Sequence, residues 1–227
     1  MPRIKAVIFD LDDTLYPERA FAFSGFAAVA KAFVEALGNP GKAQSEMQRL
    51  FDTQHRRRVF NEVLRGRGLS EDTQLLTQMI ETYREHTPSI ALYADAAAAL
   101  ARLRPRFRLG LITDGPERTQ SAKIAALGIA DSFDSMILTG HWPEGFAKPH
   151  PRAFEETASR LGVAHAECAY IADNPAKDFV APIALGWLTI RIRREQGIYI
   201  DAPAAPGGEA RHVVDSLQTI DEIIERA

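Results

Sequence analysis

The chain has 227 residues, of which 46% are hydrophobic, so it can bury a full core without disulfides or a structural metal. A formal net charge of -3 gives no bulk attraction to nucleic acid or to an anionic membrane, so we expect neither as a partner. With one cysteine, no signal-peptide pattern and no run of about 18 apolar residues, we expect a soluble protein of the cytoplasm.

The first predicted element is a β-strand at residues Ile4–Phe9. This run is apolar apart from one lysine and contains a valine and two isoleucines, which is typical of a strand covered on both faces. It ends at an acidic group, Asp10, Asp12 and Asp13. Asp13 adjoins this pair, and aspartate is a common turn residue after a strand. We therefore expect Asp13 to be a solvated turn or cap residue.

Residues 16–88 carry helical patterns and no convincing strand. Three helices are predicted, separated by breaks that contain glycine: Phe21–Leu37, Lys42–Arg65 and Glu71–His86. Asp10 and Thr113, which end the first two predicted strands, are 103 residues apart, whereas a βαβ unit needs about 30. The surplus predicts a helical domain at residues 16–88, inserted into a core domain made of residues 1–15 and 89–227.

From residue 90 onward, predicted helices and strands alternate. The predicted strands are Phe107–Thr113, Ser135–Leu138, Cys168–Ala172, Leu188–Ile192 and His212–Val214. The predicted helices are Asp95–Arg104, Glu117–Leu127, Pro151–Leu161, Asn174–Leu185 and Leu217–Arg226. This alternation indicates an α/β fold with a doubly wound parallel sheet, to which the inserted all-helical domain is added.

Polar residues suited to chemistry lie at or near the ends of the predicted strands. In an open parallel sheet, ligands bind outside the carboxyl ends of the strands, so residues distant in sequence meet there. The residues expected to converge are Asp10, Asp12, Thr113, Lys148, Asp173 and Asp178. Several carboxylates this close need a proton or a cation among them, and oxygen ligands without a His or Cys cluster favour Mg²⁺.

The same group contains donors for a phosphate. Lys148 is a point charge, and Thr113 with the backbone N–H of Asp114 can surround phosphate oxygens. In that setting Asp10 is expected to be the nucleophile, and Asp12 the general acid and then the general base. The pattern therefore predicts phosphoryl transfer through an aspartyl-phosphate.

Four motifs of the chain resemble those of the haloacid dehalogenase-like hydrolase superfamily. They are the DxDxT motif in Ala6–Thr14, the strand end in Leu109–Gly115, the lysine in Ala147–Pro151 and the GDxxxxD-like segment Ala172–Asp178. The resemblance covers residues 4 to about 192. It implies a Rossmann-like core with a helical cap inserted after the first motif, and the activity of a phosphatase on a small phosphorylated substrate.

The resemblance also implies roles for single residues. Asp10 would be the nucleophile and Asp12 the acid and base, and the phosphate would be held by Thr113, Asp114 and Lys148.

For the metal, the resemblance implies that Asp10, the backbone carbonyl of Asp12 and Asp173 bind Mg²⁺. Asn174 and Asp178 would support the site. Ala172 departs from the family's pattern, which has glycine there, and this matters only if the backbone needs a positive φ.

Several readings of the activity remain open. An acid at Asp12 favours phosphoryl chemistry over dehalogenation, because the dehalogenase branch lacks an aspartate there. The substrate is expected to be a sugar phosphate or a nucleotide monophosphate. The alternatives are a phosphotransferase or mutase acting on a sugar phosphate, and a receiver-like module that accepts a phosphoryl group without turnover.

Overall fold

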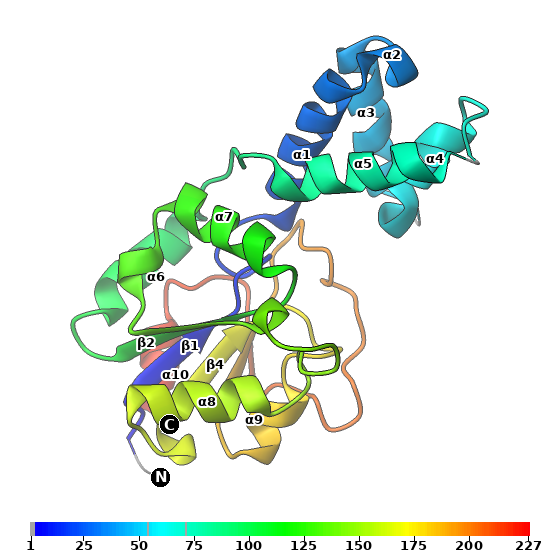
Figure 1. Ribbon diagram of the computed structural model, residues 1–227. Helices are drawn as coiled ribbons and strands as arrows, with labels where there is room; N and C mark the ends of the chain where they lie inside the picture. Colours follow the sequence, from blue (N-terminus) through cyan, green and yellow to red (C-terminus); the bar gives the residue numbers. More distant parts are fainter. Residues whose placement is uncertain (1–2, 54, 71) are drawn as a thin grey trace. The chain divides into compact units, whose positions relative to one another are not determined.

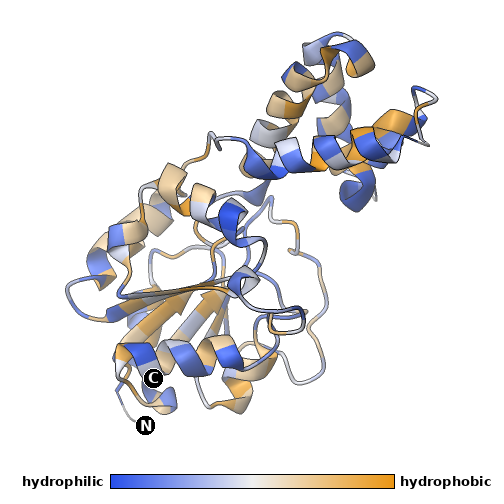
Figure 2. Cartoon of the chain, in the orientation of Figure 1, coloured by the Kyte–Doolittle hydropathy of each residue, from blue (hydrophilic) through white to orange (hydrophobic). Residues whose placement is uncertain are grey.

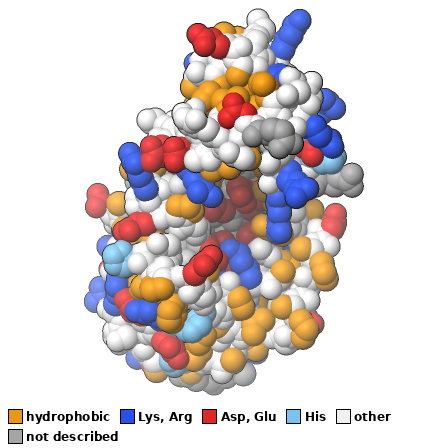
Figure 3. Space-filling model, turned by 45° about the vertical axis from the view of Figure 1, so that its right-hand side comes forward, with side chains coloured by type: hydrophobic (Ala, Val, Ile, Leu, Met, Phe, Trp, Pro, Cys, Tyr) orange, Lys and Arg blue, Asp and Glu red, His pale blue; other side chains and the backbone are white. Residues whose placement is uncertain are grey.

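The computed structural model describes residues 3–53, 55–70 and 72–227. The chain divides into two compact units, one made of Met1–Glu18 with Ala91–Ala227 and the other of Arg19–Ile90. Among the described residues, no helix combines the length and the apolar character needed to cross a membrane. Acidic and basic side chains are interspersed over the face drawn in Figure 3, in keeping with the small net charge.

The larger unit is built on a six-stranded parallel sheet of order β3-β2-β1-β4-β5-β6. Its strands are β1 (Ala6–Phe9), β2 (Arg108–Thr113), β3 (Ser135–Leu138), β4 (Cys168–Ala172), β5 (Leu188–Ile192) and β6 (His212–Val214). Strand β1 lies between β2 and β4, with Phe9 opposite Leu111 on one side and Ile171 on the other. The predicted α/β doubly wound fold is therefore confirmed.

Helices cover both faces of this sheet. In Figure 1, α8 and α9 lie on one face, and α6 and α7 lie on the other. The helices of this unit are α6 (Ala94–Leu103), α7 (Glu117–Leu127), α8 (Arg152–Leu161), α9 (Val180–Ala184) and α10 (Ile220–Glu225). The strands are hydrophobic along most of their length, whereas α8 alternates polar and apolar residues (Figure 2), because only one side of a covering helix faces the core.

The smaller unit is all-helical. Its helices are α1 (Glu18–Ala32), α2 (Val34–Leu37), α3 (Pro40–Phe51), α4 (Val59–Arg65) and α5 (Thr73–Glu85), with a 3₁₀ turn at Arg56–Arg58. Phe26 lies at the centre of its core, with ring centroids of Phe51, Phe60 and Tyr83 at 5.9, 6.0 and 5.7 Å. Aromatic packing of this kind joins α1, α3, α4 and α5 into one hydrophobic core.

The long helices predicted in this region are divided in the structure. The predicted helix Phe21–Leu37 is interrupted at Phe33, and Lys42–Arg65 becomes α3, the 3₁₀ turn and α4. The predicted start of the third helix, Glu71, lies outside the described residues. Helix α5 begins at Thr73, where the Asp72 carboxylate accepts a hydrogen bond from the Leu75 N–H at 2.8 Å.

The helix predicted at Asn174–Leu185 is mostly a turn, and only Val180–Ala184 is helical. Side-chain and backbone contacts of Asn174 and Asp178 hold residues 174–178 in that turn instead. This difference affects the candidate site directly, because the turn carries its last motif.

Candidate active site

The carboxyl ends of the three central strands bring the first site residues together. Asp10 directly follows β1, Thr113 is the last residue of β2, and Asp173 directly follows β4. All three are buried. The Asp10 N–H donates to the Ile171 carbonyl of β4 at 2.9 Å, so the backbone at Asp10 is fixed by the neighbouring strand.

The Lys148 ammonium lies at the centre of the site. Its side chain is 0% exposed, and Nζ lies 2.7 Å from Asp10 Oδ1 and 2.9 Å from Asp178 Oδ1. Nζ also donates to the Tyr170 hydroxyl at 3.0 Å. Burial opposes the charged ammonium, but the carboxylates of Asp10 and Asp178 outweigh it and hold the pKa of Lys148 well above its ordinary value.

Burial raises the pKa of Asp10 to about 6; Lys148 acts against this rise, and Asp178 adds to it. The Asp10 anion is therefore less stable than a carboxylate anion in water, even though the Lys148 ammonium lies beside it. An anion held in this way is well suited to attack an electrophile.

Three carboxylates form an acidic cluster: Asp10, Asp173 and Asp178. One oxygen from each lies within 4.8 Å of the others. In the described part of the chain, Asp173 has neither a hydrogen-bond donor nor an ion-pair partner at its carboxylate. Burial, Asp178 and Asp10 raise the pKa of Asp173 well above its ordinary value.

The acidic cluster fits a hard divalent cation. Its donors are all carboxylate oxygens, and the Lys148 ammonium by itself cannot balance three negative charges. Oxygens at opposite positions around Mg²⁺ lie about 4.2 Å apart, so a small side-chain shift would complete such a site. The cluster includes Asp178, which the sequence analysis expected only as a supporting residue.

The turn after β4 organises the last motif. The Asn174 N–H donates to Asp178 Oδ2 at 3.0 Å, and the Asp178 N–H donates to the Asn174 carbonyl at 3.0 Å. Ala172 stands where the family usually has glycine. The backbone there does not adopt a positive φ, so glycine is not required at this position. Within the described ranges, the one non-glycine residue with positive φ is Asp13.

The Asp12 carboxylate is held by donors from two segments. Tyr16 OH donates to Oδ1, Lys123 Nζ lies 2.7 Å from Oδ1, and Gln120 Nε2 donates to Oδ2 at 3.0 Å. Burial by itself would raise the pKa of Asp12. The Lys123 ammonium and the hydrogen bonds outweigh it, so the pKa is lowered.

The loop after β2 is braced through the side chain of Asp114. This carboxylate accepts hydrogen bonds from the Thr139 hydroxyl at 2.8 Å, the Lys148 backbone N–H at 3.2 Å and Lys177 Nζ at 2.7 Å. Burial would raise the pKa of Asp114, but the two lysines and these hydrogen bonds lower it. A Cβ at Gly140 would lie 2.0 Å from the Gly115 carbonyl, so only glycine allows the two loops to approach this closely.

Asp13 lies in a turn, as expected, but the expectation that it is solvated was wrong. Asp13 is 1% exposed, and its carboxylate accepts the backbone N–H groups of Glu18 and Ile198, each at 2.8 Å. Its φ of 48° is tolerated because aspartate can adopt the left-handed conformation. Asp13 thus ties the start of α1 to the loop after β5.

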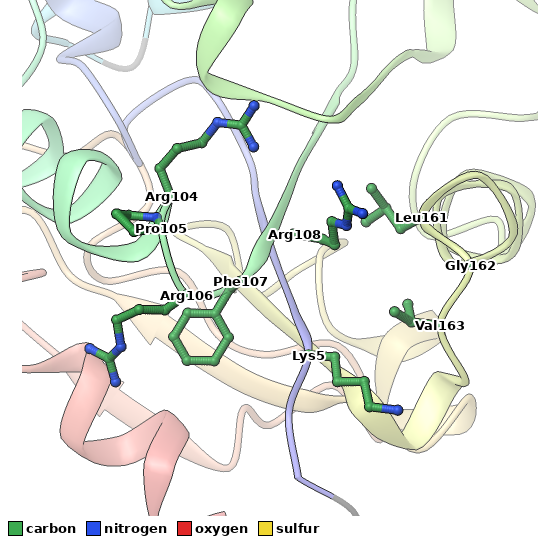
Figure 4. Close-up of a pocket in the computed structure, with 9 residues that line it drawn as sticks. All are labelled: Lys5, Arg104, Pro105, Arg106, Phe107, Arg108, Leu161, Gly162 and Val163. Carbon is green, nitrogen blue, oxygen red and sulfur yellow. The ribbon is translucent and has the colours of Figure 1, made fainter.

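A pocket of about 470 Å³ lies at the amino ends of β1 and β2, away from the acidic cluster (Figure 4). Several basic side chains line it, but they are paired with carboxylates. Arg104 and Arg108 contact Asp134 at 2.9 and 3.4 Å, and Lys5 contacts Glu167 at 2.6 Å. Each of these cations already contacts a carboxylate, which weakens its attraction for an added anion.

A family model for haloacid dehalogenase-like hydrolases matches residues 4–186. The chain belongs to this family. Glyceraldehyde 3-phosphate phosphatase of Methanopyrus kandleri is 33% identical over 202 residues, which cover 84% of each chain. Phosphoserine phosphatase of Thermus thermophilus is 28% identical over 252 residues, covering 92% of this chain and 98% of that one. The crystal structure of a 2-haloacid dehalogenase from Pseudomonas syringae matches with a TM-score of 0.63 and 26% identity, covering 98% of this chain and 99% of that one.

The site of this haloacid dehalogenase-like hydrolase contains four residues that sequence reasoning missed. Tyr170 lies inside an apolar strand run and therefore resembled core, and Lys177 lies between two motif residues. Gln120 and Lys123 lie within α7 and are buried. The one available signal was their spacing of three, which places two polar residues on one face of a predicted helix.

Proposed function

We propose that this haloacid dehalogenase-like hydrolase is a Mg²⁺-dependent phosphatase that hydrolyses a small phosphorylated metabolite through an aspartyl-phosphate on Asp10. The observation that carries the proposal is the buried Lys148 ammonium, 2.7 Å from Asp10, beside the carboxylates of Asp173 and Asp178. Its family membership and the names of its phosphatase relatives support the same activity.

Mg²⁺ would be held by Asp10 and Asp173, with the Asp12 backbone carbonyl and Asp178 as further oxygen donors. When bound, the ion supplies positive charge against the negative charge that spreads over the phosphoryl oxygens. The other positive groups come from the protein. Lys148 Nζ lies 2.7 Å from Asp10 Oδ1, and the Thr113 hydroxyl with the Asp114 N–H would provide neutral donors for the phosphate.

The chemistry assigned to the side chains divides into two steps. In the first, which begins with Asp12 in its acid form, an Asp10 oxygen forms a bond to phosphorus while the bond from phosphorus to the leaving oxygen breaks. Asp12 gives that oxygen its proton. In the second, water attacks phosphorus, Asp12 takes the proton of the water, and the bond between Asp10 and phosphorus breaks. The products are an alcohol and inorganic phosphate, and both carboxyl groups return to their starting state.

We propose that residues 16–88 act as a cap that excludes bulk water and selects the substrate. The aromatic core around Phe26 makes this unit a stable body of its own. The named substrates of the two relatives, glyceraldehyde 3-phosphate and phosphoserine, are small phosphate monoesters. We therefore favour a small phosphorylated metabolite, with sugar phosphates and nucleotide monophosphates as the wider set to be screened.

The test is phosphate release from p-nitrophenyl phosphate and from a panel of phosphorylated metabolites, with and without chelator. We expect turnover that needs Mg²⁺ and that Asp10→Asn abolishes, whereas the matched control Lys5→Met retains it, because Lys5 pairs with Glu167 at the opposite end of β1. Activity in Asp10→Asn, or activity unaffected by chelation, would refute the proposal.

The alternatives give different products in the same assays. A mutase would return an isomer of a sugar phosphate without free phosphate. A receiver-like module would keep its phosphoryl group for minutes with negligible turnover. Halide release from a 2-haloacid would indicate the activity named for the Pseudomonas syringae structure, a reaction that requires no proton transfer to a leaving oxygen.

A further inference from the structure

Helix α7 turns two polar side chains into the protein. Gln120 is 1% exposed and Lys123 is 5% exposed, and their spacing of three places them on one face of the helix beside the buried Ile124. A buried lysine or glutamine is costly unless its polar atoms are paired. A helix that served only to cover the sheet would carry apolar residues at these positions.

Both side chains reach the same carboxylate. Lys123 Nζ lies 2.7 Å from Asp12 Oδ1, and Gln120 Nε2 lies 3.0 Å from Asp12 Oδ2. Two donors from a single helix therefore hold the two oxygens of Asp12. This leaves the carboxylate little freedom to rotate, because any rotation would break at least one of these contacts.

Gln120 also contacts the phosphate-binding loop. Its Nε2 donates to the Thr113 hydroxyl oxygen, so the Thr113 proton is free to point toward another acceptor. A Cβ at Gly115 would lie 3.4 Å from the Gln120 carboxamide carbon, so the loop packs directly against this side chain. The Gln120 amide thus links the expected acid and base, Asp12, to an expected phosphate donor, Thr113.

We propose that Gln120 and Lys123 are positioning residues that fix the Asp12 carboxyl for proton transfer to the leaving oxygen. The inference rests on the proposed phosphatase function. In the step concerned, the oxygen–phosphorus bond to the leaving group breaks and the proton moves from the acid form of Asp12 to that oxygen. The donors around Asp12 lower its pKa and so reduce the fraction in the acid form. Their role in this step is therefore to place the carboxyl, and the losses expected below are net of the larger acid fraction that their removal leaves. Misplacing Asp12 therefore slows the reaction in proportion to how much the leaving oxygen needs the proton.

Two substrates separate this role from a structural one. An alkyl phosphate such as glycerol phosphate leaves as a strongly basic alkoxide that needs a proton, whereas p-nitrophenyl phosphate leaves as a weakly basic phenolate. The value of kcat/KM reports steps only up to the departure of the leaving group, so the later attack of water does not enter. A change in the ratio of the two kcat/KM values between wild type and a variant therefore reports on proton donation to the leaving oxygen.

The experiment compares this ratio in wild type, Asp12→Asn, Lys123→Met and Gln120→Met. We expect Asp12→Asn to lose on the order of 10²–10⁴ in kcat/KM on glycerol phosphate and far less on p-nitrophenyl phosphate. Lys123→Met and Gln120→Met should lose on the order of 10- to 100-fold more on the alkyl than on the aryl substrate, as expected for a carboxyl displaced by about 1 Å. Lys123→Arg should recover part of the ratio, and the remote Lys5→Met should leave it unchanged.

Two results would overturn the inference. One is an equal loss on both substrates, which would show that α7 supports the fold or the phosphate and not proton transfer. The other is an unchanged ratio in both Lys123→Met and Gln120→Met while Asp12→Asn alters it. Gln120→Met changes no charge, so it decides the question if Lys123→Met fails to fold. Failure of the phosphatase function itself is distinct, because wild type would then release no phosphate dependent on Asp10.

Discussion

Replacing Lys148 by methionine removes the ammonium that contacts the carboxylates of Asp10 and Asp178 while keeping much of the side-chain volume. Lys148 is fully buried, and its Nζ lies within 3 Å of both carboxylates. Removing one partner of a buried ion pair costs about 3–5 kcal/mol, because the remaining charge stays out of water without compensation. We expect a loss of this size at about pH 8.

The same loss should shrink at lower pH. The pKa of Asp10 is about 6 with Lys148 present, against an ordinary value of 3.8, and it rises further when the ammonium is removed. A carboxyl whose pKa is higher in the folded than in the unfolded state takes up a proton on folding, so the folded state is favoured as the pH falls. At about pH 5.5 we expect the loss to be about 1–2 kcal/mol smaller than at about pH 8.

Urea unfolding at the two pH values, with chelator present so that no divalent cation substitutes for the ammonium, measures both quantities. Lys5→Met is the matched control, because the Lys5 side chain is 61% exposed and its removal should change stability little at either pH. A loss in Lys148→Met no larger than in the control, or one that is the same at both pH values, would refute the reasoning.

Three further predictions follow from single contacts. Gly140→Ala places a Cβ 2.0 Å from the Gly115 carbonyl, and thermal unfolding should show a loss of about 1–3 kcal/mol together with reduced turnover. Asp95→Asn removes the anion that Arg194 contacts at 2.7 Å and should cost about 1.5–3 kcal/mol. Because the pKa of Asp95 is lowered from 3.8, this difference should be present above that pH and disappear in urea titrations as the pH falls through the lowered value. Tyr170→Phe removes a hydroxyl that accepts from the buried ammonium and should reduce kcat equally from about pH 6 to 9, because the pKa of Tyr170 lies well above that range.

Local pattern was sufficient for the sheet and for the residues that end its strands. The strands Ser135–Leu138, Cys168–Ala172, Leu188–Ile192 and His212–Val214 lie where they were predicted. Cys168–Ala172 is buried along its whole length and is therefore continuously apolar. The same local reading was less accurate in residues 16–88. Helix ends there depend on packing around the aromatic core, which periodicity alone does not show.

The sequence by itself determined the α/β fold and the group of residues, Asp10, Thr113, Lys148 and Asp173, that parallel strands must bring to one edge. Only the tertiary structure decided which side chains surround them. Gln120, Lys123 and Tyr170 occupy positions that would suit ordinary surface or core residues, and their polar contacts arise from chain segments up to 111 residues away. Neighbours of this kind follow from the packing of whole elements, and no short stretch of sequence contains that information.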